Sequence, residues 1–246
     1  MDDLKAYFTS DYQIGQIKIH NPTLQEIAEY GEDKFWDAVM AIIATRYDCR
    51  LYLWNYGIDF NNIHEWQVIC QRVKDHVFPD CSLVLPNVTF DRLGVYVDNQ
   101  SKELVLFDPV TQLKILENDF TELQDYLRKM LNLAKHDIRD GNEHTRKWRL
   151  QHDLDKLKRQ QARGDFGKFK SVLKSYVSAL INCAGFKYDW QTVRDLPIHV
   201  FMDSAQRLQM IQQSQHLLQG IYSGNVSYKD LKHKEELNWL REIKPK

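Results

Sequence analysis

Alternating apolar positions near the start of the chain predict a short β-strand. Ile14, Ile17 and Ile19 are separated by polar residues or glycine within residues 13–20. A strand with one buried face has this period of two, because successive side chains point to opposite sides of a sheet. We expect Asn21-Pro22 to end the strand, since proline cannot donate to a ladder of hydrogen bonds.

A capping box at residues 23–26 predicts the first long helix. The Thr23 hydroxyl can accept a backbone N–H of the first turn, while the Glu26 carboxylate can reach back to the Thr23 N–H. Apolar residues then continue at roughly helical spacing to residue 43. Gly31 interrupts this run, so a break into two helices is expected there.

The middle of the chain mixes aromatic helical pieces with one clear hairpin. Aromatic residues between 49 and 78 favour short helices packed through their rings. The apolar segments 94–98 and 103–107 flank the polar loop Asn-Gln-Ser-Lys, a pattern typical of a β-hairpin. Asp119 followed by Glu122 then predicts a helix, whose apolar face contains Phe120, Leu123, Leu127, Met130 and Leu131.

The pattern of the second half predicts helices and no strands. Residues 166–180 carry an amphipathic pattern that includes Phe166 and is closed by Gly185. Pro197 is expected in the first turn of a helix that runs to Gly220. A last helix is expected over residues 227–243, and its candidate buried residues are Leu231, Leu237 and Leu240.

These elements predict a mainly α, α+β protein. Residues 1–140 form a mixed α+β domain with a short strand and a β-hairpin. Residues 141–164, with seven Lys and Arg against three Asp and Glu, form a basic helical connector. Residues 165–246 form a helical domain, a bundle of the three helices just described.

Composition limits the class of protein without giving a function. At 246 residues and 43% hydrophobic content, the chain can bury a core without disulfides. The first ten residues lack the basic and apolar regions of a secretory signal, and the longest apolar run, 38–44, is too short for a membrane span. We therefore expect a soluble protein inside the cell, with free, buried thiols at its four cysteines.

The usual signatures of enzymes and cofactor sites are absent from the sequence. We expect no enzyme activity and no cofactor. One cluster has the residue types of a zinc site, but every gap in it holds four or five residues, where structural zinc sites place two ligands two to four residues apart. Ordinary core cysteines and surface histidines explain it better than metal ligands do. Its members are His64, Cys70, His76 and Cys81.

Two polar helices are candidate binding surfaces. The connector could contact nucleic acid through Arg146, Lys147, Arg149, Lys158 and Arg159. A solvated face is the simpler interpretation, and a net charge of −1 gives no global attraction, so we do not expect nucleic acid as a partner.

The glutamine-rich helix has an outer face that is polar but nearly uncharged. Such a face loses less solvation on binding a partner than a charged one. An exposed surface without a partner is the alternative. The candidate partner-binding residues are Gln209, Gln212, Gln213 and Gln219, and the expected core stripe of the same helix is Phe201, Ala205, Leu208, Ile211 and Leu218.

Several stretches, taken together, resemble a family of siphophage morphogenesis proteins from phages of Gram-positive bacteria. The similarity lies in residues 16–35, where a strand leads into a Pro-Thr-x-x-Glu-Ile helix, in Leu51-Tyr-Leu-Trp-Asn-Tyr-Gly-Ile-Asp59, and in residues 180–240. The last stretch includes Phe201-Met-Asp-Ser204, Gly220-Ile-Tyr-Ser-Gly224 and Asn238-Trp-Leu240. The resemblance covers most of the chain and is weakest in the basic connector.

This resemblance implies a tail assembly chaperone, which coats the helical tape-measure protein before the tail tube forms. It implies a partner among the tail proteins, self-association as a further property, no catalytic residues, and a place in the host cytoplasm. Two alternatives remain open at this point. One is a stoichiometric virion component of the tail or head-tail connector, and the other is a nucleic-acid-binding accessory protein.

Overall fold

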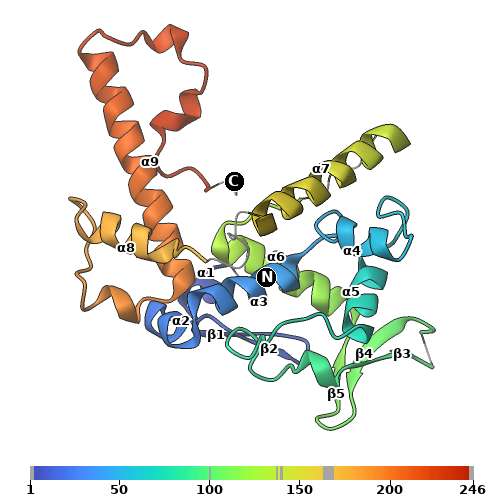
Figure 1. The fold of residues 1–246 in the computed structure, drawn as a ribbon. Helices are drawn as coiled ribbons and strands as arrows, with labels where there is room; N and C mark the ends of the chain where they lie inside the picture. Colours follow the sequence, from blue (N-terminus) through green and yellow to red (C-terminus); the bar gives the residue numbers. More distant parts are fainter. Residues whose placement is uncertain (1–2, 100, 137, 139–140, 163–168, 244–246) are drawn as a thin grey trace.

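The computed structural model describes residues 3–99, 101–136, 138, 141–162 and 169–243 (Figure 1). The predicted α+β class is confirmed, because helices dominate and the strands form two small sheets. In chain order the elements are α1 Asp3–Phe8, β1 Asp11–Ile14, β2 Ile17–His20, α2 Leu24–Tyr30, α3 Glu32–Ile43, α4 Arg50–Asn55, α5 Glu65–Lys74, β3 Gly94–Val97, β4 Leu104–Asp108, β5 Leu113–Ile115, α6 Glu117–Leu131, α7 Glu143–Ala162, α8 Leu173–Ile181 and α9 Ile198–Tyr222.

The first sheet is a hairpin, so the prediction of a single strand over residues 13–20 is wrong. Gly15 has a φ of +53°, which a residue with a side chain rarely adopts, and the chain reverses there between β1 and β2. The three predicted isoleucines are nevertheless buried. The hairpin packs on α6, where the rings of Tyr12 and Tyr126 stack with centroids 4.7 Å apart.

The helix start at Thr23 and the break at Gly31 are both confirmed. The Thr23 hydroxyl accepts the Glu26 N–H at 3.2 Å, and the Glu26 carboxylate accepts the Thr23 N–H at 2.8 Å. Gly31, with a φ of +109°, ends α2 and precedes the first residue of α3. Gly31 is therefore both the end of α2 and the N-cap of α3.

The predicted hairpin is confirmed, and a third strand extends it to a three-stranded sheet. β3 pairs with β4 and β4 with β5, all antiparallel. Helix α6 begins at Glu117, two residues before the expected start, and the Asp119 carboxylate accepts the Leu116 N–H at 3.4 Å. All five residues of the predicted apolar face of α6 are buried.

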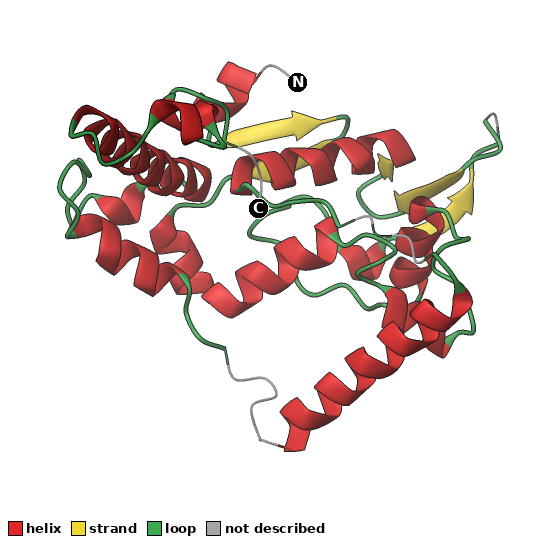
Figure 2. Cartoon of the chain, turned by 90° about the horizontal axis from the view of Figure 1, so that it is seen from above, coloured by secondary structure: helices red, strands yellow, loops and turns green. Residues whose placement is uncertain are grey.

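A single large cluster of buried side chains joins both halves of the chain. Helix α6 contacts α3 and α9, and residues of α8 and α9 share this cluster with residues of α2 and α3. A second, smaller cluster lies beside α7 and consists of Tyr47, Cys49, Leu53, Phe60 and Val68. In Figures 1 and 2, α7 extends away from the body, and Figure 1 shows the same of the far end of α9. Within the described ranges no helix combines the length and apolar character that a membrane span requires.

Helix α8 is shorter than predicted. It starts at Leu173, after a turn, and only Leu173 and Leu180 of the expected apolar face are buried. Phe169, Val172 and Tyr176 are between 45% and 48% exposed, so the described residues leave this part of the expected apolar face uncovered. Phe166 lies outside the described residues.

Helix α9 follows the predicted course but not the predicted burial. Pro197 is its N-cap, and the helix continues through Gly220. Phe201 and Ala205 are buried as expected, whereas Leu208, Ile211 and Leu218 are only half-buried. The reason is that α9 extends beyond the body of the protein (Figure 1), where its main packing partner is the C-terminal segment.

The helix expected over residues 227–243 is absent from the structure. This segment has only two short 3-10 turns, Tyr228–Asp230 and Lys234–Leu237, and Leu240 is 69% exposed. Its carbonyl groups bond to α9 side chains: Ser214 donates to the Leu237 carbonyl, and Arg207 to those of Trp239 and Arg241. A continuous helix would have used such carbonyls within its own ladder.

Candidate functional site

An apolar groove lies between α2 and α8. Its volume is about 380 Å³. The floor consists of buried Leu24, Ile27 and Leu173, and the wall contains half-buried Val177. The remaining lining residues are Ala28, Glu32, Ser171, Lys174, Ser178 and Ile181. The groove thus offers uncovered apolar surface between two helices, with charged groups only at Glu32 and Lys174.

Helical spacing explains why these side chains converge. On α8, residues 173, 177 and 181 recur every four positions and share one face, which extends about 12 Å along the axis. On α2, residues 24, 27 and 28 form the facing stripe. Sequence reasoning missed the groove, because it treated the apolar positions of each helix separately and did not pair α2 with α8. Their spacing indicates an apolar face, but it does not show what covers that face.

The start of α8 is held by an acid from α3. The Glu32 carboxylate accepts the N–H groups of Val172 and Leu173, both at 2.9 Å, and the hydroxyl of Ser171. These N–H groups have no partner within the helix, and a negative charge at a helix N-terminus is favourable. Glu32 therefore fixes α8 relative to α3.

The start of α2 is held by backbone bonds to the start of α9. The Leu24 N–H donates to the Leu196 carbonyl at 3.0 Å, and the Ile198 N–H donates to the Pro22 carbonyl at 2.8 Å. Thr23 and Pro197 form the bridge between these two short segments. Both walls of the groove are thus anchored at their N-termini, so the groove is preformed.

The glutamines of α9 lie where sequence reasoning placed them, on an exposed face. Gln209, Gln212, Gln213 and Gln219 are all exposed. Gln212 donates to the sulfur of Cys183 at 3.1 Å. Gln209 and Gln213 line a cleft of about 350 Å³ between α9 and the C-terminal segment, whose other side carries His233, Glu235, Glu236, Arg241 and Glu242.

The five basic residues singled out on α7 divide into two sets. Arg146 faces the body and pairs with Asp59, and the Arg149 guanidinium lies over the Tyr47 ring and donates to its hydroxyl. Lys147, Lys158 and Arg159 are exposed on the other side of the helix. The inward set therefore holds α7 in place and is not available to a ligand.

The zinc-like residues do not converge among the described residues, in which no three His, Cys, Asp or Glu side chains form a metal-sized group. Cys70 and Cys81 are buried, and burial raises the pKa of their thiols to about 11 and about 12. His64 and His76 are exposed and lie near different acids. Cys49 is also buried, whereas Cys183 is half-buried, contrary to expectation.

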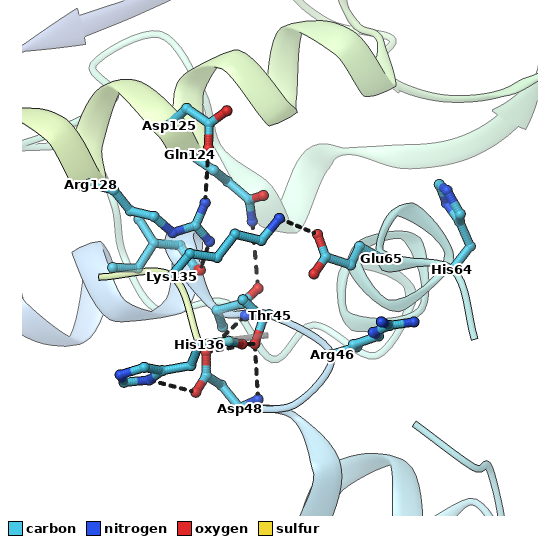
Figure 3. A network of polar contacts seen from close by, with 12 residues as sticks. Thr45, Arg46, Asp48, His64, Glu65, Gln124, Asp125, Arg128, Lys135 and His136 are labelled. Atoms are coloured by element: carbon cyan, nitrogen blue, oxygen red, sulfur yellow. Dashed lines mark hydrogen bonds and ion pairs between the residues drawn. The ribbon is translucent and has the colours of Figure 1, made fainter. Parts of the chain in front are cut away.

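A polar network joins the end of α3 to α6 (Figure 3). Gln124 donates to the Ile42 carbonyl at 2.8 Å, and Arg128 donates to the Ile43 carbonyl. These two buried side chains satisfy carbonyls that the last turn of α3 leaves open. At the edge of the network Lys135 pairs with Glu65 at 3.2 Å. The network satisfies the end of a helix, which gives it a structural role.

Part of the chain matches a known protein family. Residues 167–244 match the model of a family described as the YomV second domain, a family of phage type. No curated protein and no solved structure matches the chain. The matched segment contains α8, α9 and the C-terminal segment, and so one wall of the groove. The expected relationship to phage proteins is thereby supported over this part of the chain.

Proposed function

We propose that the protein is a phage tail assembly chaperone that binds helical segments of the tape-measure protein. The observation that carries the proposal is the preformed apolar groove between α2 and α8. A helix-in-groove complex needs such a surface, and the partner contributes apolar side chains at positions i, i+3 or i+4, and i+7. About 12 Å of groove corresponds to two turns of a partner helix.

The physical need for such a protein follows from the partner. A long amphipathic helix outside its tube exposes contiguous apolar surface and aggregates. Covering that surface during assembly in the host cytoplasm would keep the helix available. The phage-type match supports this setting, since its residues include the α8 wall of the groove.

A matched pair of variants tests the proposal. Ser178→Glu places a carboxylate in the groove, whereas Ala179→Glu places one at the next position, which does not line it. Both residues are exposed, so neither change should unfold the protein. Removing a carboxylate from water at an interface is costly, and Lys174 beside it offsets only part of that cost, so Ser178→Glu should reduce capture of co-expressed tape-measure fragment, and Ala179→Glu should not.

Two results would refute the proposal. One is equal solubility of the tape-measure fragment with and without the protein. The other is equal capture by the two variants, since the groove would then not be the contact. Quantifying the protein in purified particles distinguishes a chaperone from a virion component. A chaperone leaves before the particle is complete, whereas a structural component stays.

A further inference from the structure

A second cavity, which we call the Arg72 cavity, lies beside the carboxyl end of α3. Its volume is about 480 Å³, within the range of sites for small organic ligands. The described residues that line it are all different from those that line the groove between α2 and α8. Apolar side chains form most of the lining, and they are Met40, Ala41, Ile43, Ala44, Cys49, Val77, Leu133 and Ala134. The polar lining residues are Asp48, Tyr52, Arg72 and His136.

Arg72 of α5 brings a buried positive charge to this lining, since the residue is only 7% exposed. Its Nη1 donates to the Ala41 carbonyl at 2.8 Å, and its guanidinium lies 4.3 Å from the centroid of the Phe78 ring. Phe78 in turn stacks on Phe90, with ring centroids 4.0 Å apart. These contacts hold the guanidinium in one position at the wall of the cavity.

Only part of the hydrogen-bonding capacity of Arg72 is used. A guanidinium carries five N–H donors, and among the described residues Arg72 makes the single hydrogen bond to Ala41 and no ion pair. That bond has a structural role, because a cation is favourable at the carboxyl end of a helix. The other donors have no partner, which is rare for a buried arginine. Their nitrogens are not fully enclosed, so an anion in the cavity can reach them.

Asp48 is the only acid among the described lining residues, and other groups already engage its carboxylate. Its Oδ2 accepts the Thr45 N–H at 3.0 Å and the Thr45 hydroxyl at 2.9 Å. The Nδ1 of His136 lies 3.4 Å from its Oδ1 (Figure 3). Asp48 forms no ion pair with Arg72 within the described part of the chain. The cavity is therefore complementary to one negative charge beside apolar surface.

We propose that the Arg72 cavity binds a small organic acid, in which one carboxylate is attached to an apolar group. The carboxylate accepts hydrogen bonds from the Arg72 guanidinium, whose planar fork suits two parallel N–H···O bonds. The apolar group lies against Ile43, Leu133 and Ala134. A phosphate would leave a second charge in apolar surroundings, which is costly, and a neutral ligand would leave the guanidinium unpaired. This inference does not depend on the groove or on the proposed function.

The test measures binding of naphthoate and of its neutral analogue naphthamide to the full chain by isothermal titration calorimetry. The native protein should bind the acid about 10- to 150-fold more tightly than the amide, because a hydrogen bond to a charged group carries this difference. Arg72→Met should remove the preference. Arg128→Met is the matched control and should keep it, because Arg128 is also buried and also bonds a carbonyl at the end of α3, but does not line the cavity.

A second pair of variants tests the cavity without changing Arg72, and so applies even where Arg72→Met does not fold. Ala134→Leu fills part of the cavity and should weaken binding of both ligands about 5-fold or more. Ala179→Leu adds the same side chain at an exposed position outside the cavity and should have no effect.

Three results would overturn the proposal. One is equal affinity of the native protein for naphthoate and naphthamide. Another is an unchanged preference in Arg72→Met, or unchanged binding in Ala134→Leu. The third is tighter binding of the dipeptide N-acetylalanylphenylalanine than of naphthoate, because the carboxylate would then belong to the end of a peptide chain and not to a small acid.

Discussion

Glu32→Ala is expected to destabilise the fold by about 2 kcal/mol. The change removes the acceptor of the N–H groups of Val172 and Leu173 and of the Ser171 hydroxyl. Loss of a side-chain cap costs about 0.5–2 kcal/mol, and loss of a negative charge at a helix N-terminus adds about 0.3–1 kcal/mol. The contact with Val172 is exposed, so the estimate lies below the sum of the two upper limits.

Thermal and urea unfolding followed by circular dichroism measure this effect. A loss of 2 kcal/mol lowers the midpoint by about 4–8 °C in a chain of this size. Asp33→Ala is the matched control, because Asp33 is an exposed acid in the same first turn of α3. In a double-mutant cycle, Glu32→Ala and Ser171→Ala should couple by at least about 0.5 kcal/mol. Equal costs for the Glu32 and Asp33 variants, or no coupling, would refute the capping role of Glu32.

Three further predictions concern protonation, thiol reactivity and the glutamine face. Burial lowers the pKa of His199, so the unfolded chain binds a proton more readily than the folded protein. The free energy of unfolding should therefore fall as the pH drops through about 6.5. Urea unfolding at pH 7.5 and 5.5 measures this fall, and His199→Gln should make it smaller. Ellman's reagent should react quickly with about one thiol of the native protein and with four in denaturant, and Cys183→Ser should abolish the quick phase, because burial raises the pKa of Cys49, Cys70 and Cys81. Gln209→Glu with Gln213→Glu adds two carboxylates to the exposed glutamine face of α9, and burying this charge against a partner is costly, so capture of tape-measure fragment should fall about tenfold; the paired change Gln160→Glu and Gln161→Glu on α7 should leave capture unaltered.

Features that depend on a few neighbouring residues were predictable from the sequence. Thr23 and Glu26 meet within one helical turn, so their capping box is written in four consecutive residues. The break at Gly31 is equally local, and the β3–β4 hairpin follows from two apolar segments around a polar loop. In each case the residues that determine the conformation lie within the segment itself.

Features that depend on distant partners were not predictable. Glu32 caps α8 from about 140 residues away, and no local pattern indicates that pairing. Residues 227–243 carry apolar positions compatible with a helix, yet Arg207 and Ser214 of α9 bind carbonyl groups of this segment, which has an irregular course with two short 3-10 turns. The groove also depends on distant partners. Its two apolar faces cannot be distinguished from core until the packing of α2 and α8 is known.

The bonds that join Pro22 and Leu24 to Leu196 and Ile198 place a constraint on the order of events during synthesis. At about 5–20 residues per second, the ribosome reaches residue 198 about 9–35 seconds after residue 22. During that interval the apolar side of α2 lacks both α8 and the start of α9. The nascent chain must therefore carry an uncovered helix face for many seconds, and a cellular chaperone that holds this face would raise the yield of folded protein.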